Sequence, residues 1–357
     1  MEIVTMKGNK KFALVLSGGG VKGAWEAGFL KYVAEVWGHK FATVCGSSAG
    51  ALNGFSYVSA AASENLPEKI VEPWNKVTFG QVAKVPWSDI FTLKFYSLMD
   101  NSPLMEFLQK NLDIEGYRKN IDTGVVETNI VTTTELSEKK AYIWVDSKMD
   151  RNYDSANWKV VKSHLGPEHA TASGAIPVAF RSVQLNEGWH IDGGLCNNTP
   201  ILPAIMSMYR DREVKTADDP EVKILVLTLP EPETKQDWTR EPTILTQTSR
   251  MFESLTVNHI SQDVSKANTI NDFLDSMGVD YFGKYRRINL LLARPRNSLD
   301  ALAATVQEDI AWGLIPSNWM TSLAFILIFQ PYIQVLLKEG YEDAKAMHNQ
   351  LEEFFNS

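Results

Sequence analysis

The sequence predicts an α/β fold with a mostly parallel central sheet. The run Lys11–Ser17 is continuously apolar, and it leads through a glycine-rich turn into a helical pattern. The run Phe41–Cys45 does the same through a second turn, and Val222–Leu229 is a third strand of this kind. Continuous apolar runs are typical of parallel strands that are buried on both faces. The turns after consecutive parallel strands meet at the carboxyl edge of the sheet, where active sites of α/β proteins form.

Composition indicates a globular protein that does not bind nucleic acid. The chain has 357 residues with 44% hydrophobic content, enough for one large or two ordinary domains. A net charge of -8 disfavours general attraction to nucleic acid or anionic membranes. Two cysteines, Cys45 and Cys196, exclude a disulfide framework and a cysteine-rich metal site. We expect neither a metal nor another cofactor.

The sequence also predicts a cytoplasmic protein without a membrane span. The first residues, MEIVTMKGNKK, lack the apolar core of a secretory signal. The longest apolar run, Leu323–Leu337, is interrupted by Gln330, Pro331 and Gln334. A bilayer span needs ~20 apolar residues. Peripheral membrane association and export without a signal peptide both stay open.

The first turn, Gly18-Gly19-Gly20-Val21-Lys22-Gly23, precedes the helical pattern Ala24–Val36. Successive glycines before a helix expose a row of backbone N–H groups, and such a row binds anions. A nucleotide phosphate is one candidate anion, and the oxyanion of a tetrahedral intermediate is another.

Two nucleotide interpretations fit this turn poorly. Gly18, Gly20 and Gly23 match a dinucleotide fingerprint, which requires an acidic residue about twenty positions later. The strand Phe41–Cys45 carries no acid, and no Gly-Lys-Ser/Thr of a phosphate-binding loop follows. We therefore favour an oxyanion hole.

The second turn, Gly46-Ser47-Ser48-Ala49-Gly50, joins a strand to a helix that continues from Ala51. Strand, G-x-S-x-G and helix form the context of a nucleophile elbow, with Ser48 as the nucleophile. Gly46 and Gly50 lack a Cβ, so they permit close approach and any positive φ. The helix N-terminus favours negative charge at the serine. The alternative is a turn that only caps a helix.

The later elements are predicted from apolar runs and punctuating residues. Strands are expected at Gly124–Asn129, Ile130–Thr134, Lys140–Asp146 and Arg287–Ala293. Helices are expected at His169–Phe180 (stopped by Pro177), Ile201–Tyr209 and Thr243–Phe273, with closing helices over 320–355, and a surface loop at Pro230–Pro242.

The segment 63–122 is an aromatic-rich insert with short, irregular helices. Its large apolar residues are Trp74, Phe79, Trp87, Phe91, Phe95, Tyr96, Leu98, Met99 and Phe107. Packing beneath surface helices is the default interpretation, and an apolar lid or channel beside Ser48 is the alternative. For contact with lipid, the stretch Trp87–Met99 is favoured over Leu323–Leu337.

Four motifs occur in order: Gly18–Gly23, Gly46–Gly50, Ala172–Pro177 and Asp192-Gly193-Gly194. Together they resemble the patatin-like phospholipase family over residues 11–200. Leu336–Ala344 also resembles the C-terminus of that family, so the resemblance implies one catalytic domain over 8–357.

The resemblance implies a three-layer α/β/α fold and a serine esterase that hydrolyses lipid acyl chains with a Ser-Asp dyad. Ser48 would be the nucleophile and Asp192 the base, with Gly18, Gly19 and Gly20 on the oxyanion loop. Lys22 departs from the more usual arginine of the family and lacks its planar fork. Gly194 stands where alanine is commoner.

Alternatives to this mechanism and to this activity remain. A carboxylate with a pKa near 4 is a weak base, although burial raises the pKa. A triad would use one of six histidines: His39, His164, His169, His190, His259 or His348. His190 shares a face with Asp192 if their segment is extended. Transacylation by the same dyad and non-catalytic lipid binding or storage are the other functions considered.

Overall fold

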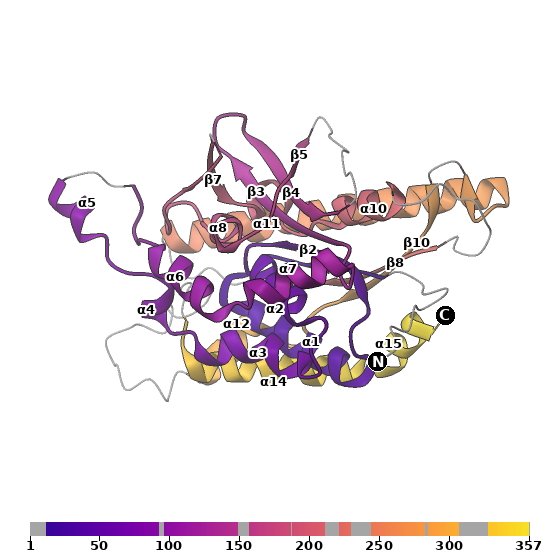
Figure 1. Cartoon of the computed structure of the whole chain (residues 1–357), viewed down its shortest axis with the longest axis horizontal. Helices are drawn as coiled ribbons and strands as arrows, with labels where there is room; N and C mark the ends of the chain where they lie inside the picture. Colours follow the sequence, from indigo (N-terminus) through magenta and orange to yellow (C-terminus); the bar gives the residue numbers. More distant parts are fainter. Residues whose placement is uncertain are drawn as a thin grey trace, which may run out of the picture.

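The structure is a computed structural model. It describes residues 12–92, 96–148, 157–186, 188–210, 221–229, 244–282, 285–306 and 328–356 (Figure 1). A central sheet has the strand order β5-β4-β3-β2-β1-β8-β10-β9, and β7 also pairs with β3 and β6. The strands are β1 Phe12–Leu16, β2 Phe41–Ser47, β3 Thr128–Glu135, β4 Lys140–Ser147, β5 Trp158–Lys162, β6 Val183–Leu185, β7 Gly188–Asp192, β8 Glu221–Leu227, β9 Tyr281–Phe282 and β10 Tyr285–Ala293.

The centre of the sheet is parallel, as the sequence predicts. Strands β3, β2, β1, β8 and β10 run in one direction. Antiparallel pairing occurs where β4 and β7 join β3, within the β6–β7 hairpin, and at the short edge strand β9. The carboxyl ends of β1 and β2 therefore lie side by side, with Leu16 opposite Gly46.

Helices cover both faces of the sheet and form a three-layer α/β/α fold (Figure 1). Along β1, Leu14 and Leu16 belong to one hydrophobic core, and Ala13 and Val15 belong to the other. One layer contains α1 Gly23–Trp37, α2 Ala49–Ala60, α3 Leu66–Lys76 and α14 Gln330–Ala346. The other contains α10 Ile201–Arg210 and α11 Ile244–Met277. The expected fold class is confirmed.

The C-terminal helix α14 packs directly on α1. A Cβ added to Gly28 would lie 2.0 Å from the Leu337 carbonyl oxygen, and one added to Gly340 would lie 1.9 Å from that of Trp25. The Trp25 indole N–H also donates to Asp343 Oδ2 at 2.8 Å. Two glycines therefore bring the helix backbones into contact, and α15 His348–Asn356 follows. Residues 320–327 of the expected closing helices lie outside the described residues.

Several boundaries differ from the sequence prediction. The helix expected at His169–Phe180 is α8 Pro167–Ser173; it ends at Gly174, and Pro177 lies beyond it. One strand, β3, replaces the two expected between Gly124 and Thr134. The short helix α9, Gly194–Asn197, follows β7 and precedes α10. The loop expected at Pro230–Pro242 falls outside the part of the chain that the structure describes.

The insert 63–122 contains the short helices expected there. They are α3, α4 Phe79–Val82, α5 Trp87–Thr92, α6 Ser102–Asn111 and α7 Ile114–Thr123. Figure 1 shows α5 standing apart from the body of the molecule, at the far left. Among the described helices, none combines the length and apolarity needed to cross a membrane.

Candidate active site

Ser48 occupies a strained corner between β2 and α2. Its φ is 52°, a value that is uncommon for a residue with a Cβ, and the residue is buried. Neither Gly46 nor Gly50 has a positive φ, which falls on Ser48 itself. Both are needed for close approach: a Cβ on Gly46 would lie 2.3 Å from the Gly50 carbonyl oxygen, and one on Gly50 would lie 2.3 Å from that of Leu16.

The Ser48 hydroxyl donates a hydrogen bond to Asp192 Oδ2 at 2.7 Å. Asp192 ends β7, which pairs with β3 beside the elbow. The Gly194 N–H donates to the other carboxylate oxygen at 2.7 Å, and the Thr134 hydroxyl donates to the Asp192 carbonyl at 2.9 Å. The fold thus holds a serine and a carboxylate from distant parts of the sequence in direct contact.

Burial changes the acid–base character of Asp192. Its side chain is shielded from water, and this burial raises its pKa to about 7, although the bonds from Gly194 and Ser48 act in the opposite direction. An ordinary aspartate, with a pKa near 4, is a weak base at neutral pH. A pKa close to the working pH suits proton transfer in both directions.

Ser173 joins the two halves of this site. Its hydroxyl accepts a hydrogen bond from the Ser48 N–H at 2.8 Å and donates to the Thr132 carbonyl at 2.7 Å. Its carbonyl accepts from the Gly193 N–H at 3.3 Å. The sequence analysis did not single out Ser173, although it lies in the motif Ala172–Pro177.

The glycine turn lies against the same site through Asn198. The Gly18 N–H donates to the Asn198 carbonyl at 3.1 Å, and the Asn198 side-chain amide donates to the Gly18 carbonyl at 3.1 Å. Gly19 has a φ of -178°, outside the left-handed region, and a Cβ there would lie 2.4 Å from Leu229 Cδ1. Gly20 has a φ of 58°, which favours glycine. No local sequence signal pointed to Asn198.

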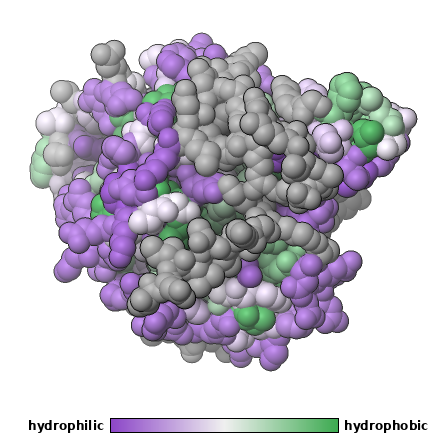
Figure 2. Space-filling view, turned by 45° about the vertical axis from the view of Figure 1, so that its right-hand side comes forward, coloured by the Kyte–Doolittle hydropathy of each residue, from purple (hydrophilic) through white to green (hydrophobic). Residues whose placement is uncertain are grey.

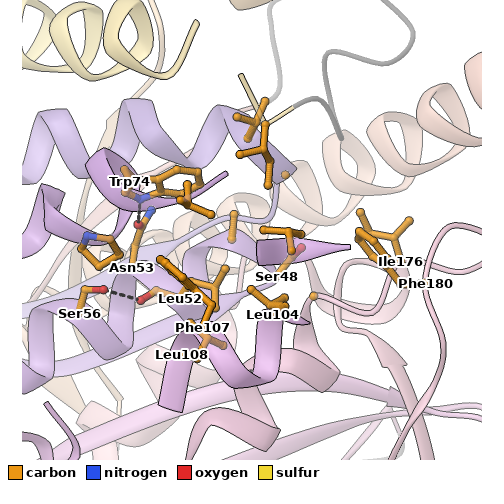
Figure 3. Close-up of a pocket in the computed structure, with 18 residues that line it drawn as sticks. Ser48, Leu52, Asn53, Ser56, Trp74, Leu104, Phe107, Leu108, Ile176 and Phe180 are labelled. Atoms are coloured by element: carbon orange, nitrogen blue, oxygen red, sulfur yellow. Dashed lines mark hydrogen bonds between the residues drawn. The ribbon is translucent and has the colours of Figure 1, made fainter. Parts of the chain in front are cut away.

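An apolar cavity opens beside Ser48 (Figure 3). Gly20 and Ser48 lie on its wall together with side chains from the insert and from the segment after α8. The principal apolar residues are Leu52, Trp74, Leu104, Phe107, Ile176 and Phe180. The channel interpretation of the insert therefore fits Trp74 and Phe107, whereas Trp87 and Phe91 are exposed and line neither the cavity nor the core.

Comparison with known families identifies this arrangement. Residues 14–205, more than half of the chain, match the family model described as patatin-like phospholipase. The chain belongs to the patatin-like phospholipase family. Membership of this family places it in the general class of lipid acyl hydrolases. The resemblance drawn from the four motifs is confirmed.

Thirteen chains of solved structures match this chain. The crystal structure of VipD from Legionella pneumophila is 14% identical, with a TM-score of 0.37 over 96% of this chain and 67% of that chain. A search of curated proteins finds no match.

Lys22 of this patatin-like chain forms a buried ion pair. Its Nζ lies 2.8 Å from Asp300 Oδ1 in α12 Leu299–Thr305, with only 6% and 15% of the two side chains exposed. The 3₁₀ turn Gly20–Lys22 is thus tied to a helix beyond residues 14–205. The Lys22 ammonium contacts Asp300 as a point charge, without the planar fork of an arginine.

A second buried carboxyl group lies behind the glycine turn. Glu26 accepts hydrogen bonds from the Ser17 N–H at 2.8 Å and the Asn53 amide at 3.0 Å. Asn53 in turn accepts from the Trp74 indole at 2.7 Å, and Ser17 Oγ accepts from the Leu229 N–H at 3.0 Å. Burial raises the pKa of Glu26 to about 8. Sequence reasoning missed this network, because Glu26 lies in no motif position.

The histidines lie elsewhere. His190 is buried, with Nδ1 3.0 Å from the Thr133 hydroxyl and its ring against Tyr142 and Trp144. Burial lowers its pKa to about 4. Across the described ranges, which include all six histidines, none hydrogen-bonds to Ser48 or Asp192. Within the same ranges, no three metal-ligating side chains cluster.

Proposed function

We propose that this protein hydrolyses acyl esters of phospholipids, lysophospholipids or related glycerolipids through an acyl-serine intermediate. The observation that carries the proposal is the 2.7 Å hydrogen bond from the strained, buried Ser48 to Asp192 at the wall of an apolar cavity. The family supplies the substrate class, lipids, and the geometry supports the assignment of roles.

In the first half-reaction, Ser48 Oγ attacks the ester carbonyl carbon while its proton passes to Asp192 Oδ2. A serine hydroxyl is a weak nucleophile until a base removes this proton.

The carbonyl oxygen becomes an oxyanion, and backbone N–H groups of the glycine turn stabilise it. One such donor is worth ~3–4 kcal/mol. The Gly18 N–H is already bonded to Asn198, so we assign the donor role to Gly19 and Gly20. Asp192 then returns the proton to the departing alcohol.

In the second half-reaction, water attacks the acyl-serine carbonyl and gives its proton to Asp192. The intermediate collapses to a free fatty acid, and Asp192 reprotonates Ser48 Oγ. The raised pKa of Asp192 fits both proton transfers, since the group must accept and release a proton in each cycle.

The acyl chain would lie in the apolar cavity, against Trp74, Leu104 and Phe107. Burial of apolar surface contributes ~25 cal/mol per Å². The histidine positions favour the dyad over a triad, because His190 bonds to Thr133 and not to the carboxylate. We further propose that the protein acts in the cytoplasm, in peripheral contact with lipid.

Active-site labelling followed by a substrate panel tests this function. A fluorophosphonate probe should label the wild-type protein and leave Ser48→Ala unlabelled. The wild-type protein should release fatty acid from at least one of phospholipid, lysophospholipid and triglyceride. Product analysis with an added alcohol would detect transfer instead of hydrolysis. A protein that binds lipid but neither reacts with the probe nor releases fatty acid would contradict the proposal.

A further inference from the structure

Five apolar side chains around α5 are left in water by the fold. Phe91 is 84% exposed, Tyr96 66%, Trp87 63%, Leu98 57% and Val85 50%. We refer to these five residues as the α5 patch. Figure 1 shows α5 carried away from the rest of the molecule. Contiguous exposed apolar side chains mark a surface that binds something apolar.

The base of this projection is fixed to the cavity. Lys84 and Asp100 exchange two backbone hydrogen bonds, of 3.0 and 2.9 Å, and so close the loop between them. The Leu98 N–H donates to the Val178 carbonyl at 2.8 Å, and the Met99 N–H donates to that of Ala179 at 2.9 Å. The hydrogen bonds of Leu98 and Met99 are made to the segment Ile176–Phe180, whose ends line the cavity beside Ser48. The α5 patch therefore projects from the rim of the proposed acyl site.

The acidic residue of α5 is buried and paired, and the exposed Lys84 beside Val85 pairs with Asp100. Asp89, in α5, is 4% exposed and forms an ion pair with Arg181. The Arg181 guanidinium carbon also lies 5.6 Å from the centroid of the Tyr96 ring. The acid of α5 is thus neutralised on the inner side, and the exposed members of the patch are uncharged. Because the whole chain carries a charge of -8, attraction to anionic head groups is not the source of binding.

We propose that the α5 patch docks this protein on a lipid–water interface of zwitterionic phospholipid, with Trp87 and Phe91 inserted among the acyl chains. The inference rests on the proposed function only for the presence of lipid as substrate. Docking at the rim places the cavity against the lipid surface, so an acyl chain passes from the bilayer to Ser48 with little exposure to water. Aromatic side chains suit this position because they bury a large apolar area.

A second exposed apolar group offers a matched control. Phe273, Met277, Tyr281 and Phe282 lie where α11 meets β9, and Phe282 is 51% exposed. In Figure 1 the end of α11 and β10 extends to the right, opposite α5. Hydrophobic side chains also show on the projecting lobe at the upper right of Figure 2. These residues are absent from the lining of the cavity, so their substitution tests whether any exposed apolar residue is sufficient for binding.

The experiment measures co-flotation of the full chain with phosphatidylcholine vesicles. All variants carry Ser48→Ala, so that binding is separated from hydrolysis. Phe91→Asp and Trp87→Ala should each weaken partitioning about tenfold, the factor that corresponds to ~1.4 kcal/mol of lost side-chain burial. Phe282→Asp should leave partitioning within twofold, and phosphatidylglycerol in the vesicles should not strengthen it. Melting temperatures check that each variant is folded.

A parallel hydrolysis assay uses proteins that keep the wild-type Ser48. This assay separates the docking inference from the proposed function. Phe91→Asp should lower hydrolysis of vesicle phosphatidylcholine about tenfold and leave hydrolysis of a dissolved short-chain ester within twofold. If no ester is cleaved but vesicle binding still depends on Phe91, docking stands and the proposed function fails. If Phe282→Asp weakens binding as much as Phe91→Asp, or if binding requires anionic lipid, the docking proposal is overturned.

Discussion

The Nζ atom of Lys22 lies 2.8 Å from Oδ1 of Asp300, and this ion pair ties the glycine turn to α12. The two residues are far apart in sequence, and Asp300 lies outside residues 14–205. A turn that presents N–H groups to an oxyanion must be held rigidly, because misplaced donors lose most of their effect. The C-terminal part of the chain therefore supports the proposed oxyanion hole.

Lys22→Ala should reduce kcat for a dissolved ester at least tenfold, with a smaller change in KM, because the donors act on the transition state. Lys22→Arg should retain most activity, since it keeps the charge. Removal of one partner of a buried pair also costs ~3–5 kcal/mol of stability. The control is Lys76→Ala, which removes an exposed pair with Glu72 worth ~0–1 kcal/mol. A lower melting temperature with unchanged kcat would reduce Lys22 to a structural role.

Ser48→Ala and Asp192→Asn should each lower hydrolysis by several orders of magnitude without unfolding the protein. The double variant should be little worse than either single one, because residues that act as a unit are not additive. His190→Gln serves as the control and should keep its activity, since His190 bonds to Thr133. Near-full activity of Asp192→Asn combined with loss in His190→Gln would establish a triad instead.

The pH dependence of kcat/KM should report the ionisation of Asp192. The base must be ionised to accept the Ser48 proton, and burial raises its pKa to about 7. Activity should therefore rise about tenfold per pH unit below 7 and level off above it. His190, whose pKa is lowered to about 4, stays neutral over this range. A plateau that extends down to pH 5 would contradict a buried aspartate base.

Glu26 should make the folded state less stable as pH rises. Its pKa is about 8 when folded and near 4.5 when unfolded, so between these values the folded state holds a proton that the unfolded state lacks. The free energy of unfolding then falls with increasing pH across this window and is constant above it. At ~1.36 kcal/mol per pKa unit the loss amounts to a few kcal/mol.

Urea unfolding at pH 5.5 and pH 9 measures this effect. Glu26→Gln keeps the shape of the side chain and removes the titration, so its loss of stability between the two pH values should be smaller than that of the wild type. Asp192 contributes in the same direction below pH 7 and remains in both proteins. Equal losses in the two proteins would show that the pKa of Glu26 is the same in the folded and the unfolded state, and would contradict a carboxyl group kept protonated by burial.

Local patterns predicted the strand, the tight turn and the helix around Ser48, because these three are contiguous in the sequence. They did not tell which residues of the two turns have a positive φ, which the structure shows at Ser48 and Gly20. Ser173 and Asn198 escaped prediction because their contacts with Ser48 and Gly18 come only from the assembled sheet.

The position of Asp192 at the end of β7, beside Ser48, also could not be predicted from local patterns. The antiparallel pairing of β7 with β3 joins segments more than fifty residues apart, and a two-glycine turn gives no sign of it. The role of Asp300 could not be predicted for a further reason, since the last of the four motifs ends at Gly194. Long-range pairing, rather than local propensity, decides these positions.

Gly20→Ala should lower kcat more than Gly19→Ala. Gly20 has a φ of 58°, and a Cβ in this region costs roughly 1–2 kcal/mol, which the turn relieves by moving its N–H groups. Gly19→Ala should be milder, because the φ of Gly19 is -178°, outside the left-handed region, and the nearest atom to its new Cβ is the terminal methyl carbon Cδ1 of Leu229. The control is Gly38→Ala, where φ is 67° and open space surrounds the site. It also places a Cβ at a positive φ, but after the C-terminal end of α1 instead of in the glycine turn, so it should lower the melting temperature and leave kcat unchanged. A higher KM with an unchanged kcat in Gly20→Ala would mean that the turn binds the substrate without stabilising the oxyanion. An equal loss of kcat in Gly38→Ala and Gly20→Ala would mean that general destabilisation explains both.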